Sequence, residues 1–282
     1  MRDRLGFDRR RAEHYWGLER RRLRDEFRIV LSAGERPAVN AAYHLWESET
    51  LLRALPRRRG LLVLDLACGL GRMSAVLSSR GIGVVGVDNA LPMLRAARKK
   101  VTGQRGRSRR PVGWLHAVSH ELPLENGSVD AVACLGLLEH LPARLQEGTL
   151  GEALRVLRPG GALYLVLNNN RSLLLQAGAD NRHRQARQLE NGYFCGLVNR
   201  EKLVRLVEKN GGQARILGSN AHYAVLRHAF RGKEISRREE AQLARDFEWA
   251  AQRDLAEPLQ GSFGETCADH FFYRITRARG GD

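Results

Sequence analysis

The sequence is poor in cysteine, in aromatic residues and in long apolar runs. Its four cysteines lie far apart and form no Cys-x-x-Cys pair, so the sequence predicts neither a zinc site nor a disulfide framework, and it favours a reducing, cytoplasmic setting. Aromatic residues make up 6% of the chain, too few to suggest a surface on which nucleic-acid bases stack. No run of about 18 apolar residues occurs, and the first residues lack the apolar segment of a secretory signal. We therefore expect neither a transmembrane helix nor a leader peptide.

The charged residues are unbalanced in sign and in type. The 282-residue chain has a formal net charge of +16, and 42 of its 47 cationic side chains are arginine. A positive excess suits a phosphate-bearing partner, but such a preference for arginine over lysine is also what a GC-rich coding sequence produces. The densest cluster, residues 98–110, holds seven cations and no acid. It is predicted to be a solvated loop or else a surface that faces phosphate on a nucleotide-activated substrate, an RNA or an anionic lipid.

Residues 61–77 have the pattern of a strand, a glycine turn and a helix. The apolar run that begins at Leu61 and ends in the acid Asp65 predicts a buried parallel strand. Gly69 and Gly71 predict a turn too tight for a Cβ, and an amphipathic stretch follows. This order brings backbone close to a nucleotide-like ligand at the carboxyl edge of an open sheet. The absence of a third glycine disfavours a dehydrogenase, and the carboxylate of Asp65 suits a cationic or amine-bearing ligand.

Apolar runs alternate with amphipathic stretches through the middle of the chain, which predicts an α/β protein with one large core. Five strands are expected, near residues 61–65, 83–87, 112–117, 129–134 and 161–167. Two helices are expected before them, over residues 8–33 and 37–56. The later expected elements are a helix over 200–210, a strand over 213–217, mostly helix over 221–257 and a last strand over 271–275.

Five motifs follow one another in order between residues 65 and 161. They are Asp65-x-x-x-Gly69-x-Gly71, the strand Val84–Asp88 with its terminal acid, Leu122-Pro-Leu124 with Gly127–Asp130, Leu137–Leu141, and Arg155–Gly161. On these motifs the chain resembles the class I S-adenosylmethionine-dependent methyltransferases, and among them the small-molecule, type-11-like group. The resemblance implies a Rossmann-like, seven-stranded mixed sheet in the order 3-2-1-4-5-7-6, with the last strand antiparallel. It also implies a helical extension or lid over residues 1–57 and a methyltransferase domain over 58–282, with insertions at about 168–198 and 221–266.

The resemblance implies S-adenosylmethionine as the cofactor and no metal. Asp88 would accept hydrogen bonds from two ribose hydroxyls, and Asp65 would support the glycine turn and the methionine end of the cofactor. Many family members place an acid near the adenine amino group where this chain has Val118. The N–H and hydroxyl of Ser119 are expected to bind the ring instead, with weaker cofactor binding or compensation by a neighbour such as His120 as the consequence. The other residues expected to line the cofactor are Ala67, Gly69, Gly71, Asn89 and Leu135.

Methyl transfer to a hydroxyl oxygen requires a base, whereas an amine or thiolate acceptor can react after desolvation alone. His140, in the Glu139-His140 pair beyond the fourth strand, lies where the family brings a residue near the methyl group. An imidazole also titrates in the range that suits a base. We therefore predict a small-molecule acceptor, methylated on a hydroxyl oxygen, with His140 as the base; a capping or packing role is the alternative. Further candidates at the lid or sheet edge are His116, His120, His183 and His222.

Other functions are distinguished by motifs that the chain lacks. DNA and RNA amino-methyltransferases usually carry an Asn/Asp-Pro-Pro-aromatic run after the fourth strand, where this chain reads Cys134-Leu-Gly-Leu-Leu-Glu-His. Cytosine-C5 enzymes need a Pro-Cys nucleophile, and Cys134 follows Ala133. The intact Gly69 and Gly71 argue against a non-catalytic relative. The main alternative is an RNA or protein methyltransferase that uses the basic residues 98–110. The sequence determines neither the acceptor nor the oligomeric state.

Overall fold

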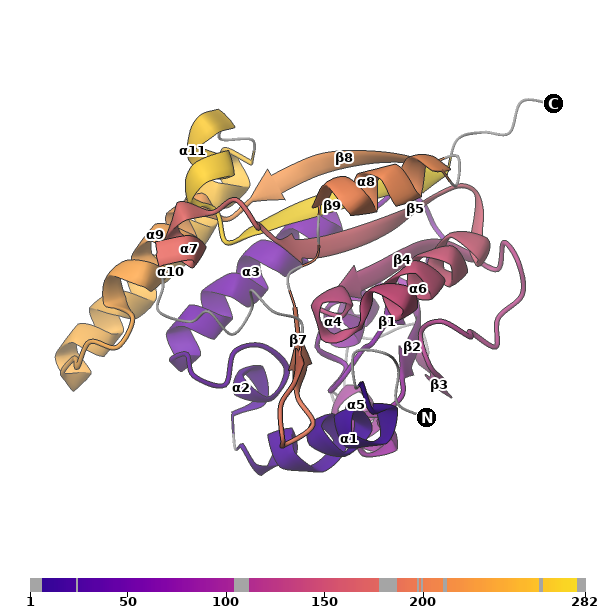
Figure 1. The fold of residues 1–282 in the computed structure, drawn as a ribbon, viewed down its shortest axis with the longest axis horizontal. Helices are drawn as coiled ribbons and strands as arrows, with labels where there is room; N and C mark the ends of the chain where they lie inside the picture. Colours follow the sequence, from indigo (N-terminus) through magenta and orange to yellow (C-terminus); the bar gives the residue numbers. More distant parts are fainter. Residues whose placement is uncertain are drawn as a thin grey trace.

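The computed structural model describes residues 7–23, 25–103, 112–177, 187–196, 198, 200–209, 212–258 and 261–277. Most of the basic cluster, with Arg105, Arg107, Arg109 and Arg110, lies outside these residues, and so does the candidate His183. Within them, one central sheet carries helices on both faces (Figure 1).

The central sheet has seven strands. In spatial order they are β3 (Val112–His116), β2 (Gly83–Asp88), β1 (Leu62–Leu66), β4 (Val129–Leu135), β5 (Leu157–Asn168), β9 (His270–Arg277) and β8 (Gly212–Ser219). The first five are parallel, and β9 runs antiparallel to both β5 and β8. Two short strands, β6 (Arg187–Gln188) and β7 (Phe194–Cys195), pair with each other outside this sheet. Numbered along the chain, the strands of the sheet therefore follow the order 3-2-1-4-5-7-6, and the predicted fold class is confirmed.

Each face of the sheet is covered by helices that bury apolar side chains on it. One face lies under α6 (Ala143–Arg155) and α8 (Arg200–Lys209), which pack on Leu64 and Val132. The other lies under α3 (Pro37–Ala54), α4 (Arg72–Ser79) and α10 (Arg237–Ala256), which pack with Val63 and Ala131. Successive residues of a strand point to opposite faces, so each strand contributes to both layers. The remaining helices are α5 (Leu91–Gly103), α7 (Leu173–Ala177), α9 (Ala221–Phe230) and α11 (Gly261–Cys267).

The predicted second helix is present as α3 and belongs to the core. It begins at Pro37, where the missing N–H is not needed for the helix. Its Trp46 is fully buried and packs in the same cluster as Phe247 of α10. The hydroxyl of Tyr164 in β5 donates to the carbonyl oxygen of Ala54 at 2.9 Å. The helix is thus fastened to the sheet at its carboxyl end, and the boundary at residue 57 stays a proposal.

The prediction of one helix over residues 8–33 is wrong. The segment forms α1 (Arg9–His14), a π-turn η1 (Tyr15–Glu19), a 3-10 turn η2 (Arg20–Arg22) and α2 (Glu26–Val30). The cause is Arg20, a buried side chain that donates to the carbonyl oxygens of Ile29 and Leu31 at 2.8 Å each. Asp25 then starts α2 by accepting from the Arg28 N–H at 2.8 Å. These bonds fold the segment back on itself and bring Ile29 against Leu70 of the glycine turn.

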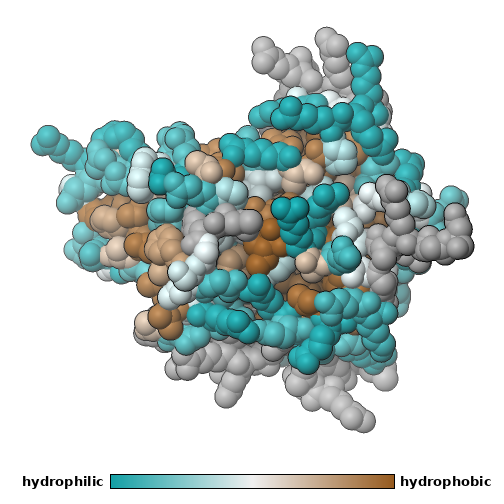
Figure 2. Space-filling model, turned by 90° about the horizontal axis from the view of Figure 1, so that it is seen from above, coloured by the Kyte–Doolittle hydropathy of each residue, from teal (hydrophilic) through white to brown (hydrophobic). Residues whose placement is uncertain are grey.

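The exposed surface is mixed. On the face shown in Figure 2, hydrophobic side chains extend from one side into the middle, and hydrophilic side chains lie around and among them. The large apolar side chains that are exposed belong to separate elements, which is normal for a folded domain: Leu18, Leu91, Leu173, Val225, Trp249 and Phe263. None of the helices in the described part of the chain combines the length and apolar character needed to cross a membrane.

Candidate functional site

The glycine turn joins β1 to α4 through left-handed backbone. Ala67, Gly69 and Gly71 have φ of 61°, 53° and 70°. A Cβ on Gly71 would lie 3.0 Å from the Cβ of Ala97 and 3.1 Å from the ring of Trp114, so this position excludes side chains for two independent reasons. Ala67 has a Cβ, so its left-handed backbone is strained. Such strain persists only where the surrounding structure fixes the backbone conformation.

Asp88 at the end of β2 binds this turn directly. Its Oδ2 accepts from the N–H of Gly69 at 2.8 Å, and its Oδ1 accepts from the N–H of Ala90 at 2.9 Å. Burial raises the pKa of Asp88, and these backbone donors oppose that rise. The backbone N–H of Asn89 also acts on this carboxylate, which has about four acceptor positions, so acceptor capacity remains for a ribose hydroxyl. The carbonyl oxygen of Asn89 accepts from Nε2 of His116 at 2.9 Å, which holds the neighbouring edge strand to the same loop.

Asp65 is buried at the end of β1 and is not among the residues that line the large cavity. Its Oδ2 accepts from the hydroxyl of Ser74 at 2.6 Å, and burial raises the pKa of Asp65 to about 6. The side chain therefore ties the end of β1 to the first turns of α4. Its contact with a cofactor stays a prediction.

The loop after β3, where the adenine ring is expected, is anchored to α6. The hydroxyl of Ser119 lies 2.7 Å from that of Thr149, and the N–H of Leu122 donates to Glu152 at 2.7 Å. Val118 and Ser119 are half-buried. A hydroxyl combines one donor with two acceptor positions, so Ser119 retains hydrogen-bonding capacity beside Thr149. The expected adenine contacts at these two residues stay a prediction.

A cavity of about 770 Å³ lies at the carboxyl ends of the central strands. Its wall includes Leu135 and Gly136 at the end of β4, followed by Glu139 and His140 in the short turn η3 (Leu138–His140). In the sheet register Asp65 pairs with Ala133, so the chain leaves β1 and β4 side by side. The cavity thus begins beside the glycine turn. The rest of its wall comes from distant segments near residues 30–47, 168–176, 189–195 and 223–247, together with Tyr15, Arg20 and His270.

His140 is fixed by one hydrogen bond and by ring packing. Its Nδ1 lies 2.9 Å from the carbonyl oxygen of Phe194, which can only accept, so Nδ1 carries the hydrogen and Nε2 keeps its lone pair. The ring centroid lies 5.0 Å from that of Trp16 and 5.4 Å from that of Tyr193. Burial and, to a smaller extent, the charge of Arg20 lower the pKa of His140 to about 4, although its hydrogen bond to the carbonyl of Phe194 opposes the shift. The imidazole is therefore neutral at pH 7 and is a weak proton acceptor.

Glu139 is a functional candidate that the sequence-based assignment missed. Its Oε2 is buried without a hydrogen-bond partner among the described residues, and the side chain lines the cavity. Burial raises the pKa of Glu139 to about 7, opposed by its own backbone N–H. The only sequence signal was its position next to His140 after the fourth strand.

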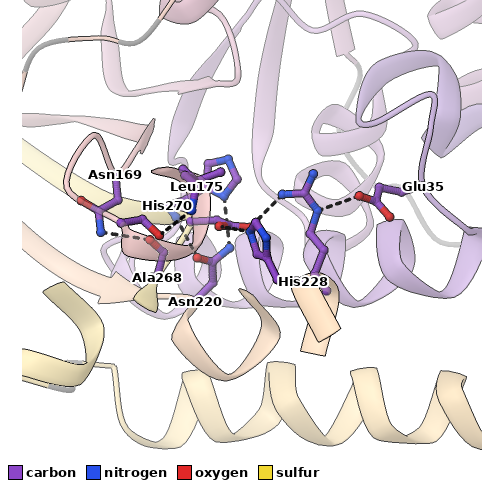
Figure 3. Close-up of polar contacts among 10 residues, drawn as sticks. Glu35, Asn169, Leu175, Asn220, His228, Ala268 and His270 are labelled. Atoms are coloured by element: carbon purple, nitrogen blue, oxygen red, sulfur yellow. Dashed lines mark hydrogen bonds and ion pairs between the residues drawn. The ribbon is translucent and has the colours of Figure 1, made fainter. Parts of the chain in front are cut away.

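A buried polar network holds the far wall of the cavity (Figure 3). Arg227 of α9 donates to Glu35 at 2.8 Å and to Asp269 at 2.7 Å, and His228 lies 3.0 Å from Asp269. Burial would raise the pKa of Asp269, but His228 and Arg227 outweigh it and lower the value to about 2. Asn169, after β5, donates to the carbonyl oxygen of Ala268 at 2.9 Å. The network joins the residue-35 loop, α9 and the starts of α7 and β9 into one wall.

The remaining histidine candidates that the structure describes do not line this cavity. His116 is bonded to Asn89, His222 lies 2.9 Å from Asp254, and burial lowers the pKa of His120. His183 is outside the described residues. No group of three or more metal-binding side chains is found among the residues that the structure describes.

Known proteins resemble this chain in its central part. Residues 64–165 match the family described as "Methyltransferase domain". A demethylmenaquinone methyltransferase from Clavibacter sepedonicus is 37% identical over 122 residues, which is 43% of this chain and 46% of that protein. The chain spans between about a third and a half of the length of the curated relatives that it matches, with 32% and 46% for the first two.

Solved structures share the fold at low identity. Magnesium protoporphyrin IX methyltransferase from Synechocystis PCC 6803, with SAH bound, superposes with a TM-score of 0.55 at 19% identity, over 74% of this chain and 92% of that chain. A SAM-dependent methyltransferase from Methanosarcina mazei gives 0.51 at 18% identity, over 81% of this chain and 97% of that chain.

The fold, the glycine turn and the acid of β2 define a class I methyltransferase architecture. The resemblance expected from the five motifs is confirmed, since residues 64–165 match the methyltransferase-domain family.

Proposed function

We propose that this chain binds S-adenosylmethionine beside the glycine turn and transfers its methyl group to a small molecule held in the 770 Å³ cavity. The observation that carries the proposal is the position of the cavity. Its wall starts at Leu135 and Gly136, where β4 ends next to the exit of β1, so a ligand on the turn and a ligand in the cavity would meet there.

The residues around the turn suit this cofactor. Asp88 has acceptor capacity left for a ribose hydroxyl, and the left-handed backbone at Gly69 brings main chain close to the ligand without a Cβ. The buried Oε2 of Glu139 has no hydrogen-bond donor among the described residues, and a cationic group of the ligand would stabilise it. When bound, the sulfonium supplies an electrophilic methyl group, and the protein's task is to hold the acceptor in line with it.

A hydroxyl oxygen remains our proposed acceptor atom. The cavity lies within the size range of small-molecule sites and combines tyrosine rings with asparagine and charged side chains, which suits an acceptor with both a ring or chain and polar groups. Relatives act on demethylmenaquinone and on magnesium protoporphyrin IX, according to their names. The sequence-based hypothesis makes His140 the base, with Nε2 as the atom that would accept the proton, but the burial that lowers its pKa to about 4 weighs against this role.

The test of the proposed function is calorimetric titration with S-adenosylhomocysteine. Micromolar binding, about −8 kcal/mol, is expected. No binding up to millimolar ligand would refute the assignment. Mass-spectrometric detection of a labelled methyl group, transferred from the cofactor to a component of a metabolite extract, would then identify the acceptor.

The alternative is an RNA or protein methyltransferase that uses residues 98–110. One described cation of this cluster, Lys100, already forms an ion pair with Glu26 at 2.8 Å, as expected if the charge of this residue stabilises the fold and does not bind a partner. Replacing Arg105, Arg107, Arg109 and Arg110 by serine should leave cofactor affinity unchanged. Submicromolar RNA binding that falls steeply with salt and weakens in this variant would favour the alternative.

A further inference from the structure

The cavity contains three carboxylates, and they differ in their partners. Glu47 pairs with Arg72, and Glu35 accepts from Arg227 at 2.8 Å. Glu139 has no such partner, and its buried Oε2 accepts no hydrogen bond from the described residues. A buried carboxylate oxygen without a donor is costly, so this position is suited to a ligand that brings positive charge or a proton.

Glu139 lies in the cavity wall just beyond the end of β4. It follows β4, the strand that pairs with β1, while Arg72, the partner of Glu47, directly follows Gly71. After burial, the charge of Glu139 contributes to raising the pKa of both Glu47 and Tyr43, so these groups lie near one another. The unpaired carboxylate is therefore at the junction of the turn and the cavity, where the methyl group would be transferred.

We infer that Glu139 faces the sulfonium end of the cofactor and takes the proton of the acceptor hydroxyl as the methyl group leaves. The inference rests on the proposed function. In this step the acceptor O–H bond breaks and its proton goes to Glu139, while the oxygen forms a bond to the methyl carbon. The carbon–sulfur bond breaks with its electron pair going to sulfur, which becomes a neutral thioether.

The charges favour this arrangement. Before transfer, the carboxylate of Glu139 offsets the positive sulfonium; afterwards the thioether and the protonated Glu139 are both neutral. A neighbouring cation lowers a carboxyl pKa by about 1–3 units, so Glu139 would ionise when the cofactor binds and hold the proton once the charge has gone. His140 is less suited, since burial lowers its pKa to about 4 whereas that of Glu139 is raised to about 7.

The test uses two ligands that differ in charge at sulfur, S-adenosylmethionine and S-adenosylhomocysteine. Calorimetry at pH 7 in buffers of different ionisation enthalpy gives the protons released on binding each one. In the wild type, the first ligand should release about 0.4–0.5 proton more than the second, because only it brings the cation beside Glu139. With a free pKa of about 7 and a value about 1–3 units lower beside the cation, the difference should be largest near pH 5.5–6.5, midway between the two values, and should vanish above about pH 9. This wild-type measurement depends on no variant.

Variants identify the group. Glu139→Gln, which keeps the shape of the side chain, should abolish the difference, and a thermal melt confirms that the variant is folded. Glu35→Gln, the matched control, removes a carboxylate of the same cavity that is already paired and should keep the difference. The inference is overturned if the wild type shows a difference below about 0.1 proton. It is also overturned if the difference persists in Glu139→Gln, or if Asp65→Asn abolishes the difference while Glu139→Gln does not. Failure of both ligands to bind would instead refute the proposed function.

Discussion

Replacing Asp88 by alanine should weaken the cofactor site and the fold together, because this carboxylate serves both. In the structure its two oxygens accept from the N–H groups of Gly69 and Ala90 at 2.8 and 2.9 Å. Without the carboxylate, two largely buried donors lose their partner at a cost of about 1–3 kcal/mol each, so the free energy of unfolding should fall by roughly 2–6 kcal/mol. Water that reaches the site would bring the loss toward the lower value.

The effect on binding is separate from the effect on folding. Loss of hydrogen bonds between a charged acceptor and the ribose hydroxyls should cost about 1.5–3 kcal/mol, which is roughly 10–150-fold in the dissociation constant. Asp88→Asn should give smaller losses, since its amide oxygen can still accept from one of the two N–H groups.

Two measurements separate these effects. Urea denaturation gives the free energy of unfolding, and calorimetry with S-adenosylhomocysteine gives the affinity under conditions where the variant is folded. An affinity within about twofold of wild type in folded Asp88→Ala would refute the ribose assignment, whatever the stability.

Two further predictions concern the cavity. His140→Ala should lower the free energy of unfolding by about 1–3 kcal/mol, since the carbonyl of Phe194 loses its donor, while turnover at saturating cofactor stays within a few-fold of wild type. A fall in turnover of roughly 10²–10⁴-fold with unchanged cofactor affinity would instead make His140 the base. Asp269 has a folded-state pKa of about 2, below its unfolded value. Its contribution of about 2–3 kcal/mol is therefore present above about pH 4 and lost as the pH falls toward 2. Urea midpoints measured from pH 6 to pH 2 should show this loss in the wild type, and it should be absent in Asp269→Asn.

Much of the fold follows from local sequence. The apolar run ending at Asp65 and the glycines at 69 and 71 specify a strand and a left-handed turn within a few residues of each other. The motif order then identified the sheet topology, including the antiparallel last strand, and Asp88 was found at the end of β2 as expected. Each of these features depends on contacts made within one strand-turn-helix unit or on a recurring order of such units.

What only the tertiary structure decided depends on partners far away in the chain. The helical pattern of residues 8–33 gives way because Arg20 finds the carbonyl oxygens of Ile29 and Leu31, and periodicity cannot predict such bonds. The cavity wall is assembled from segments separated by more than two hundred residues. The contrast between Glu139 and His140 also depends on the tertiary structure. Burial raises the pKa of the Glu139 carboxyl and lowers that of the His140 imidazole. The packing of distant segments determines this burial, and the neighbours of the two residues in sequence do not.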